Sequence, residues 1–424
     1  MNPATLAASR RFPLVGRPRP ACPALPDRVN EIADIAQGAV QEGADGLAEG
    51  AHALNKAALV ASDCGMPTLA RDLCWQHINI YRSADRPLTV LQARYLLEPV
   101  LNLARLHLRA GAGDRALQLL TSMYLAVTSH TDLVVDGHAL PLTGLTGTRH
   151  DHHKLREWVW LHLVGDGIRA LVLAGRWDDA VAHARAHRGI GLHLMEGRQA
   201  TILAHCLNGR SAAAMTALAG STPEQPWELQ VASCLTAMCT DGTPASRNIA
   251  NMIKNFVGQE PIPGYAVFRA QLGLTVATLA SPTDRAAANG ILAQVADEVI
   301  KAGDGYAARD VLRHSDAQAA GLTSEQGSAL SDLLASSGLE AGGLPEPLLR
   351  SLLSSAHTAA EALSSSIPLH DHLVAVEAGP GPGAHLDARR RAPGLPVEQP
   401  AAGGSEAVPV QPRGSRGHPL ADLP

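Results

Sequence analysis

The sequence predicts an all-α protein, a right-handed α-α superhelix of stacked helical hairpins with one short β-hairpin-like insertion and disordered termini. The first observation is composition: 46% of the residues are hydrophobic but only 3% are aromatic, so small and aliphatic side chains must build the core. Alanine is the best helix former, and the valine, isoleucine and aromatic runs typical of strands are scarce. The second observation is a two-helix pattern that recurs along residues 27–370.

Each unit of this pattern is an apolar helix, a glycine, and a small residue five positions later in a second helix. Glycine takes the left-handed conformation that ends a helix, and a small residue lets two antiparallel helices approach closely. Because one such hairpin cannot bury its apolar face alone, several must stack. The turn glycines are Gly65, Gly111, Gly175 and Gly209, and the small residues are Ala70, Ala116, Ala180 and Ala214.

The unit around the second glycine has the most complete pattern, with Val100, Leu103, Ala104, Gly111, Asp114, Ala116 and Leu120. In this order of residues the chain resembles the tetratricopeptide repeat, over roughly half of its length. It departs from that family because Thr128 stands where the closing proline is expected, and because successive turn glycines, with Gly303 as the fifth, lie 46, 64, 34 and 94 residues apart. The resemblance implies stacked hairpins whose first helices line a ligand groove.

The segments outside the hairpins differ in composition. Residues 1–26 contain Pro13, Pro18 and Pro20, so we expect a disordered N-terminal arm before the array of residues 27–370. Within the array, residues 129–153 form an insertion, in which Asp136-Gly137 between two short apolar runs predicts a β-hairpin. Residues 371–424 are expected to be a disordered tail, because the last 46 residues contain 9 Pro and 8 Gly and too little apolar surface to offset chain entropy.

Composition also limits the partners. The net charge of −5 and the pI near 6.4 argue against a nucleic-acid backbone as a direct partner. No apolar run reaches the roughly 18 residues that span a bilayer, so no membrane is expected. The six cysteines include no CxxC pair and are expected to be reduced thiols of a cytoplasmic protein. No cofactor motif is present.

The first helices of the hairpins share a polar face that is the leading candidate for a binding site. The resemblance implies that Lys56, Asn102 and Arg105 hold the backbone and terminal carboxylate of a peptide, whereas Asp166 stands where a base is expected. Independently, the forked guanidinium of arginine suits carboxylates and phosphates. The alternative is an ordinary solvated face. The residues of this face are Asn55, Lys56, Asn102, Arg105, Arg109, Asp166 and Arg169.

The run from Thr148 to His153 allows three interpretations. Thr148 can cap a helix that begins near Arg149, with Asp151 completing a capping box. The same helix start, with Thr148 and Arg149, can bind an anion through its unpaired N–H groups. A third interpretation is a metal site, although four adjacent residues point in different directions and no paired spacing supports one. The metal candidates are His150, His152 and His153.

These observations predict a noncatalytic binding or regulatory module that recognises a protein, a peptide or an anionic small ligand. No nucleophile arrangement such as GxSxG is present. The alternative from another class is an enzyme or a metal or phosphate sensor that uses the His-rich insertion, residues 129–160.

Overall fold

The computed structural model describes residues 2–84, 87–240, 243–318 and 321–367, and the tail predicted over residues 371–424 lies outside them. Within the described residues the all-α prediction is confirmed, since the chain forms successive helices and one antiparallel pair of short strands. None of these helices combines the length and the apolar character that crossing a membrane requires.

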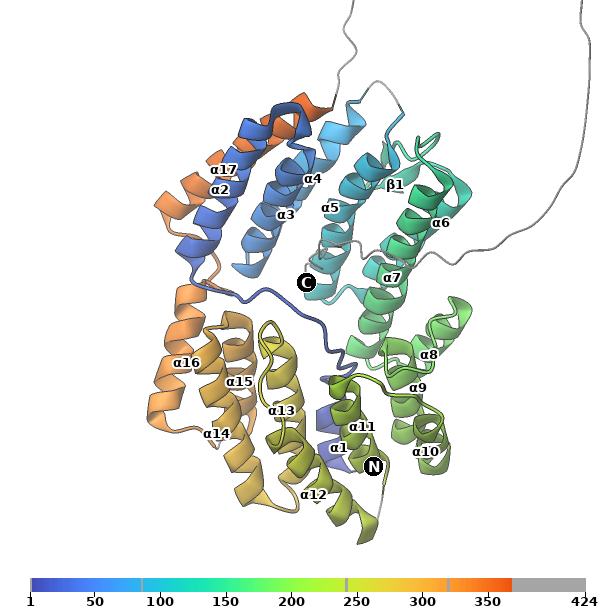
Figure 1. Ribbon diagram of the computed structural model, residues 1–424, viewed down its shortest axis with the longest axis vertical. Helices are drawn as coiled ribbons and strands as arrows, with labels where there is room; N and C mark the ends of the chain where they lie inside the picture. The colour runs from blue at the N-terminus through green and yellow to red at the C-terminus, as the bar shows by residue number, and fades with distance from the viewer. Residues whose placement is uncertain (1, 85–86, 241–242, 319–320, 368–424) are drawn as a thin grey trace, which may run out of the picture. The chain divides into compact units, whose positions relative to one another are not determined.

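The predicted hairpins are present as packed pairs of consecutive helices (Figure 1). The first four pairs are α3 (Leu47–Asp63) with α4 (Pro67–Arg82), α5 (Val90–Arg109) with α6 (Gly113–Ser129), α7 (Arg149–Leu173) with α8 (Trp177–Ala186), and α9 (Glu196–Leu207) with α10 (Ser211–Ala219). The next three pairs are α11 (Pro226–Cys239) with α12 (Thr243–Val257), α13 (Ala266–Ala280) with α14 (Arg285–Ala302), and α15 (Gly305–Gln318) with α16 (Ser324–Ser337).

The turn chemistry of the first four hairpins agrees with the sequence pattern. The four turn glycines have φ angles between 71° and 77°, the left-handed region that side chains with a Cβ disfavour. The four paired alanines are at most 1% exposed, so each lies where two helices meet. A larger side chain at these positions would force the helices apart.

The odd-numbered helices from α3 to α15 form one continuous layer, because each of them contacts the next odd-numbered helix along the chain. The remaining elements are α1 (Pro3–Ser9), α2 (Leu25–Glu42), the short 3-10 helix η1 (Gly43–Asp45) and α17 (Glu346–Ser366). Figure 1 shows α17 returning to lie beside α2, and α17 contacts both α2 and α3. The first hairpin is therefore covered by helices from both ends of the described chain.

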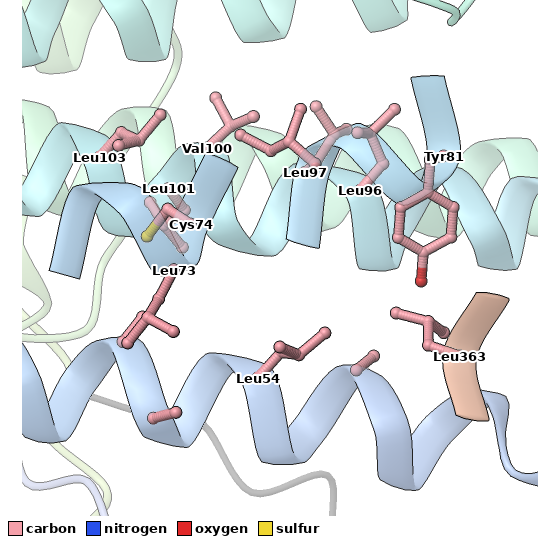
Figure 2. Close-up of a cluster of buried hydrophobic side chains, with 14 of the residues drawn as sticks. Leu54, Leu73, Cys74, Tyr81, Leu96, Leu97, Val100, Leu101, Leu103 and Leu363 are labelled. Atoms are coloured by element: carbon pink, nitrogen blue, oxygen red, sulfur yellow. The ribbon is translucent and has the colours of Figure 1, made fainter. Parts of the chain in front are cut away.

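Aliphatic side chains from these helices make the largest buried cluster. Leu54 of α3, Leu96 and Leu97 of α5, and Leu363 of α17 are fully buried in it. Figure 2 shows leucines of α3, α4, α5 and α17 in this cluster, with Tyr81 at one end of it. Burying a leucine of this kind contributes about 1.5 to 3 kcal/mol, so this cluster holds α17 against the first hairpins.

The insertion contains the predicted β-hairpin. Strand β1 (Leu133–Val135) pairs antiparallel with β2 (His138–Leu140), and Asp136 and Gly137 between them have φ of 49° and 82°. Two successive residues with positive φ make the primed turn that suits the twist of a hairpin. Leu133 and Leu140 are buried, so the hairpin packs on the helices and is an ordered part of the fold.

The prediction that residues 1–26 form a disordered N-terminal arm is wrong for the residues from Asn2 onward, which the structure describes. Residues Pro3–Ser9 form α1, which packs on α13, and the extended residues that follow bury Phe12 and Leu14. The prolines stop a helix but are compatible with an extended chain. Composition missed this segment because its few large apolar side chains are buried by distant helices, and no local pattern shows that.

Candidate binding site

The polar face predicted on the first helices is assembled by side chains of α3, α5 and α7. Asn102 Nδ2 of α5 donates to Asn55 Oδ1 of α3 at 3.3 Å, and Asn55 Nδ2 donates to the Glu98 carboxylate at 2.6 Å. Both asparagines are buried. Their amide groups therefore connect two neighbouring hairpins and are largely shielded from solvent.

Glu98 was missed by the sequence analysis, although it lies one helical turn before Asn102 on the same helix. Burial raises the pKa of Glu98 to about 7, while Arg94 and the hydrogen bond from Asn55 oppose the rise. The carboxyl group therefore changes its charge near neutral pH. An acidic residue four positions before an asparagine that the sequence places on a polar face was the signal that could have found it.

Arg105 and Asp166 form an ion pair between α5 and α7, with 3.5 Å between Nη2 and Oδ2. Burial disfavours the charged form of Asp166, but Arg105 and the His162 ring outweigh burial and hold the pKa of this carboxyl below its usual range. Asp166 is therefore the acid that neutralises Arg105. This pairing explains why an acid stands where the tetratricopeptide resemblance led us to expect a base.

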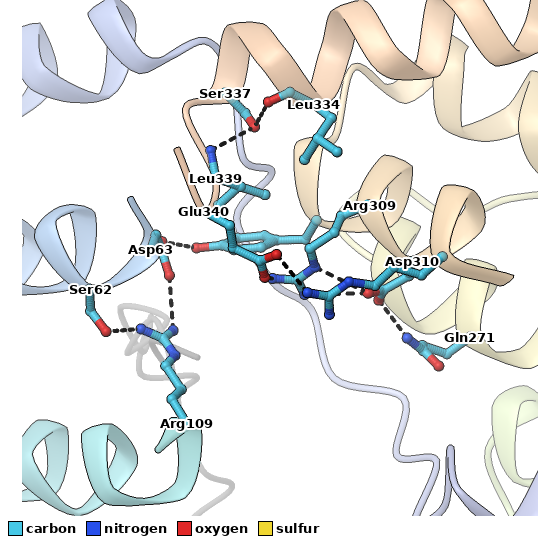
Figure 3. Close-up of polar contacts among 12 residues, drawn as sticks. Ser62, Asp63, Arg109, Gln271, Arg309, Asp310, Leu334, Ser337, Leu339 and Glu340 are labelled. Carbon is cyan, nitrogen blue, oxygen red and sulfur yellow. Dashed lines mark hydrogen bonds and ion pairs between the residues drawn. The ribbon is translucent and has the colours of Figure 1, made fainter. Parts of the chain in front are cut away.

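Arg109, at the end of α5, reaches back to the end of α3. Its Nη2 donates to Asp63 Oδ1 at 2.9 Å, and its Nη1 donates to the Ser62 hydroxyl, as Figure 3 shows. Asp63 is also paired with the buried Arg28 of α2 at 2.5 Å and accepts the Tyr306 hydroxyl of α15. The Asp63 carboxylate therefore forms ion pairs with the guanidinium groups of both Arg28 and Arg109.

Asp63 was not among the residues predicted from the sequence. An acid in the last turn of a helix is disfavoured by the partial negative charge of that helix end, so its presence before the Cys64-Gly65 turn was a usable signal. Its partners Arg28 and Tyr306 lie 35 and 243 residues away in the chain, and no local pattern identifies them.

A shallow depression, here called the α3–α5 pocket, lies where these side chains meet. Its polar lining is Ser62, Asn102, Arg105 and Arg109, over a floor that includes Ala58. Its interior has room for the centres of water-sized groups over only about 10 Å³, about the space of one water molecule. Small-molecule sites typically have about 300 to 1,000 Å³, so the pocket itself admits no more than one small polar group, such as a carboxylate oxygen at its mouth.

The charge around the pocket is positive in excess. Burial lowers the pKa of Arg105, and the charge of Asp166 opposes this effect. The positive charges of Arg169 and Arg109 lower the pKa of Arg105 further, so these three guanidinium groups lie near one another. Arg169 is exposed and forms no ion pair with any residue that the structure describes. Arg109 shares Asp63 with Arg28, and its side chain is 44% exposed. These two arginines are the ones available to an anion.

Other predicted site residues lie elsewhere. Lys56 is paired with Glu31 of α2 and does not line the pocket. Thr148 caps α7: its hydroxyl accepts the Asp151 N–H at 3.2 Å, and its own N–H donates to Asp151 Oδ2 at 3.0 Å. The capping interpretation is therefore confirmed. Arg149 is exposed at the same helix start.

The histidines near Thr148 do not assemble a metal centre. Across residues 2–84, 87–240, 243–318 and 321–367, no three His, Cys, Asp or Glu side chains gather in a group that could hold a metal ion. His152 instead contacts the ring of His130, with centroids 5.9 Å apart. The structure therefore does not bring His150, His152 and His153 together around one ion.

Comparison with known proteins adds no relative to these observations. No protein-family model matches the chain, and no curated protein and no solved structure matches it either.

Proposed function

We propose that this protein is a noncatalytic binding module of the cytoplasm, resembling tetratricopeptide arrays, that recognises a protein or peptide partner through an anionic group. The observation that carries the proposal is the α3–α5 pocket, which Arg109 lines. The positive charges of Arg109 and of Arg169, whose charge also acts on Arg105, are not fully neutralised by the acids around them. A C-terminal carboxylate or an acidic side chain of the partner is the group that fits.

The layer of first helices supports this function physically. Asn55, Asn102 and Arg105 are held in place by bonds to Glu98, to each other and to Asp166 before any ligand arrives. A preorganised site loses less side-chain entropy when it binds. Because Ser62 and Asn102 also line the pocket, a carboxylate there meets hydroxyl and amide groups as well as guanidinium groups.

The test is selection of random peptides that carry a free C-terminus against the full-length protein, followed by calorimetry with the selected peptides. Arg109→Ala is the informative variant, because Asp63 keeps Arg28 and Tyr306 as partners and the fold retains its buried pair. A charged hydrogen bond contributes about 1.5 to 3 kcal/mol, so affinity should fall roughly tenfold or more, and a C-terminal amide should bind as weakly.

The matched control is Arg115→Ala, which removes an equally charged, exposed arginine from α6, outside the pocket. It should leave affinity unchanged. The proposal fails if no peptide is enriched, or if the selected peptides bind the two variants and the unmodified protein equally well.

A further inference from the structure

One side-chain amide holds the extended N-terminal residues by their backbone. Gln199 of α9, fully buried, accepts the Leu14 N–H at 2.8 Å and donates its Nε2 to the Leu14 carbonyl at 2.7 Å. An amide that pairs with both backbone groups of one residue recognises an extended chain whatever side chain that residue carries. Binding proteins hold extended peptides in this way, with main-chain bonds for affinity and side-chain pockets for specificity.

The same segment inserts apolar side chains between helices. Phe12 and Leu14 are 3% and 4% exposed and belong to the buried cluster that α9, α11 and α13 share. Gly16 lies against the Trp227 side chain of α11, where an added Cβ would come within 2.4 Å of Cγ. The contact therefore requires apolar residues at two positions and glycine two residues further along.

Arginines flank this apolar part and find partners on the odd-numbered helices. Arg11 Nη2 lies 2.8 Å from His314 Nδ1 of α15, and Arg17 is paired with Glu196 of α9 at 2.9 Å. The Arg19 guanidinium stacks on the Tyr306 ring, 4.0 Å from its centroid, and the Arg19 N–H donates to a loop carbonyl at 2.7 Å. Charge, aromatic and backbone contacts thus alternate along one extended stretch.

We infer that residues 11–19 are a displaceable intramolecular ligand, and that the surface they cover on α9, α11, α13 and α15 is a second binding site. Its partner is a protein segment of the same chemistry: extended, with Phe and Leu two residues apart, then glycine, and with flanking arginines. The inference does not rest on the proposed function, since it uses none of the residues of the α3–α5 pocket.

The covalent connection of residues 11–19 to the rest of the chain limits the access of a partner to the second site. Residues 20–24 tether the segment to α2, and Cys22 among them is buried and hydrogen-bonded to Asp304 and Gly305. Even a flexible tether of this length gives an effective concentration in the mM range. A partner segment therefore competes poorly until residues 11–19 are released. The structure in this way describes a closed state of the second site.

The experiment uses the full chain and a fluorescent peptide of residues 8–20. Gly16→Val, which cannot fit beside Trp227, should release the segment and leave its binding surface intact. By fluorescence anisotropy the peptide should bind this variant at least about tenfold more tightly than the unmodified protein. Adding Gln199→Ala should remove that gain, and a peptide that itself carries Gly16→Val should not bind.

Gly38→Val is the matched control, because apart from its chain neighbours and the adjacent backbone of its own helix no atom lies within 4 Å of a Cβ at that position. This variant should bind the peptide as weakly as the unmodified protein. If Gly16→Val keeps its helix content by circular dichroism and does not bind the peptide, the inference is overturned.

Hydrogen exchange of the unmodified protein supplies a second, independent measurement. The Leu14 amide should exchange through a local opening that costs less free energy than the opening of the α9 amides. Equal free energies for both would show that the segment leaves only when the fold unfolds, and would also overturn the inference, whether or not Gly16→Val folds.

Discussion

Replacing Asp63 with asparagine removes the charge that joins α2, α3, α5 and α15. The Arg28 and Asp63 side chains are only 10% and 3% exposed, and they lie 2.5 Å apart. Breaking a buried ion pair by neutralising one partner costs about 3 to 5 kcal/mol, because the other charge is left without compensation. Asparagine still offers an oxygen to the Tyr306 hydroxyl, so we expect a loss of about 3 to 4 kcal/mol in the free energy of unfolding.

Urea unfolding followed by circular dichroism measures this loss. Asp114→Asn is the matched control, since its pair with Arg176 is exposed, with Asp114 at 83%, and exposed pairs contribute about 0 to 1 kcal/mol. Adding Arg28→Met to Asp63→Asn should recover part of the loss, because it removes the orphaned charge. A loss below about 1 kcal/mol for Asp63→Asn, equal to that of the control, would refute the reasoning.

Two further variants test the pH dependence and the packing of the hairpins. The pKa of Glu98 is about 7 in the folded chain and 4.5 ordinarily. Between these pH values the native state therefore binds more protons than the unfolded state, so the free energy of unfolding falls by about 2 to 3 kcal/mol as pH rises through that window. Glu98→Gln should flatten this slope in urea unfolding at pH 5 to 8, and an unchanged slope would exclude Glu98 as its source. Ala180→Leu should lower the free energy of unfolding by about 1 to 3 kcal/mol, because the larger side chain overpacks α7 against α8, and this loss is measured as a lower Tm. Ala182→Leu, on the exposed side of α8, should leave the Tm unchanged. Equal effects of the two variants would contradict close packing at Ala180.

The sequence was sufficient for the hairpins because their determinants are local. The left-handed conformation at Gly111 and the burial of Ala116 follow from residues five positions apart, and both are as predicted. The turn at Asp136-Gly137 is equally local, and so is the cap that Thr148 forms with Asp151.

The pocket could be predicted only in part. Asn102, Arg105 and Arg109 were chosen from the face of one helix, and all three line the pocket. Their acidic partners were not predicted, because an ion pair between helices depends on how the hairpins stack. The pairing changes the chemistry: Arg105 is neutralised by Asp166, which leaves Arg109 and Arg169 as the available cations.

By itself the sequence determined the helical hairpins, their turn glycines and small packing residues, and the β-hairpin, since backbone preferences and side-chain spacing act over a few residues. Only the tertiary structure decided that Asp63 joins four helices, that α17 packs beside α2, and that the backbone of Leu14 is hydrogen-bonded by the amide of Gln199, 185 residues away. These contacts depend on distances between segments remote in the chain, which exist only once the helices have packed.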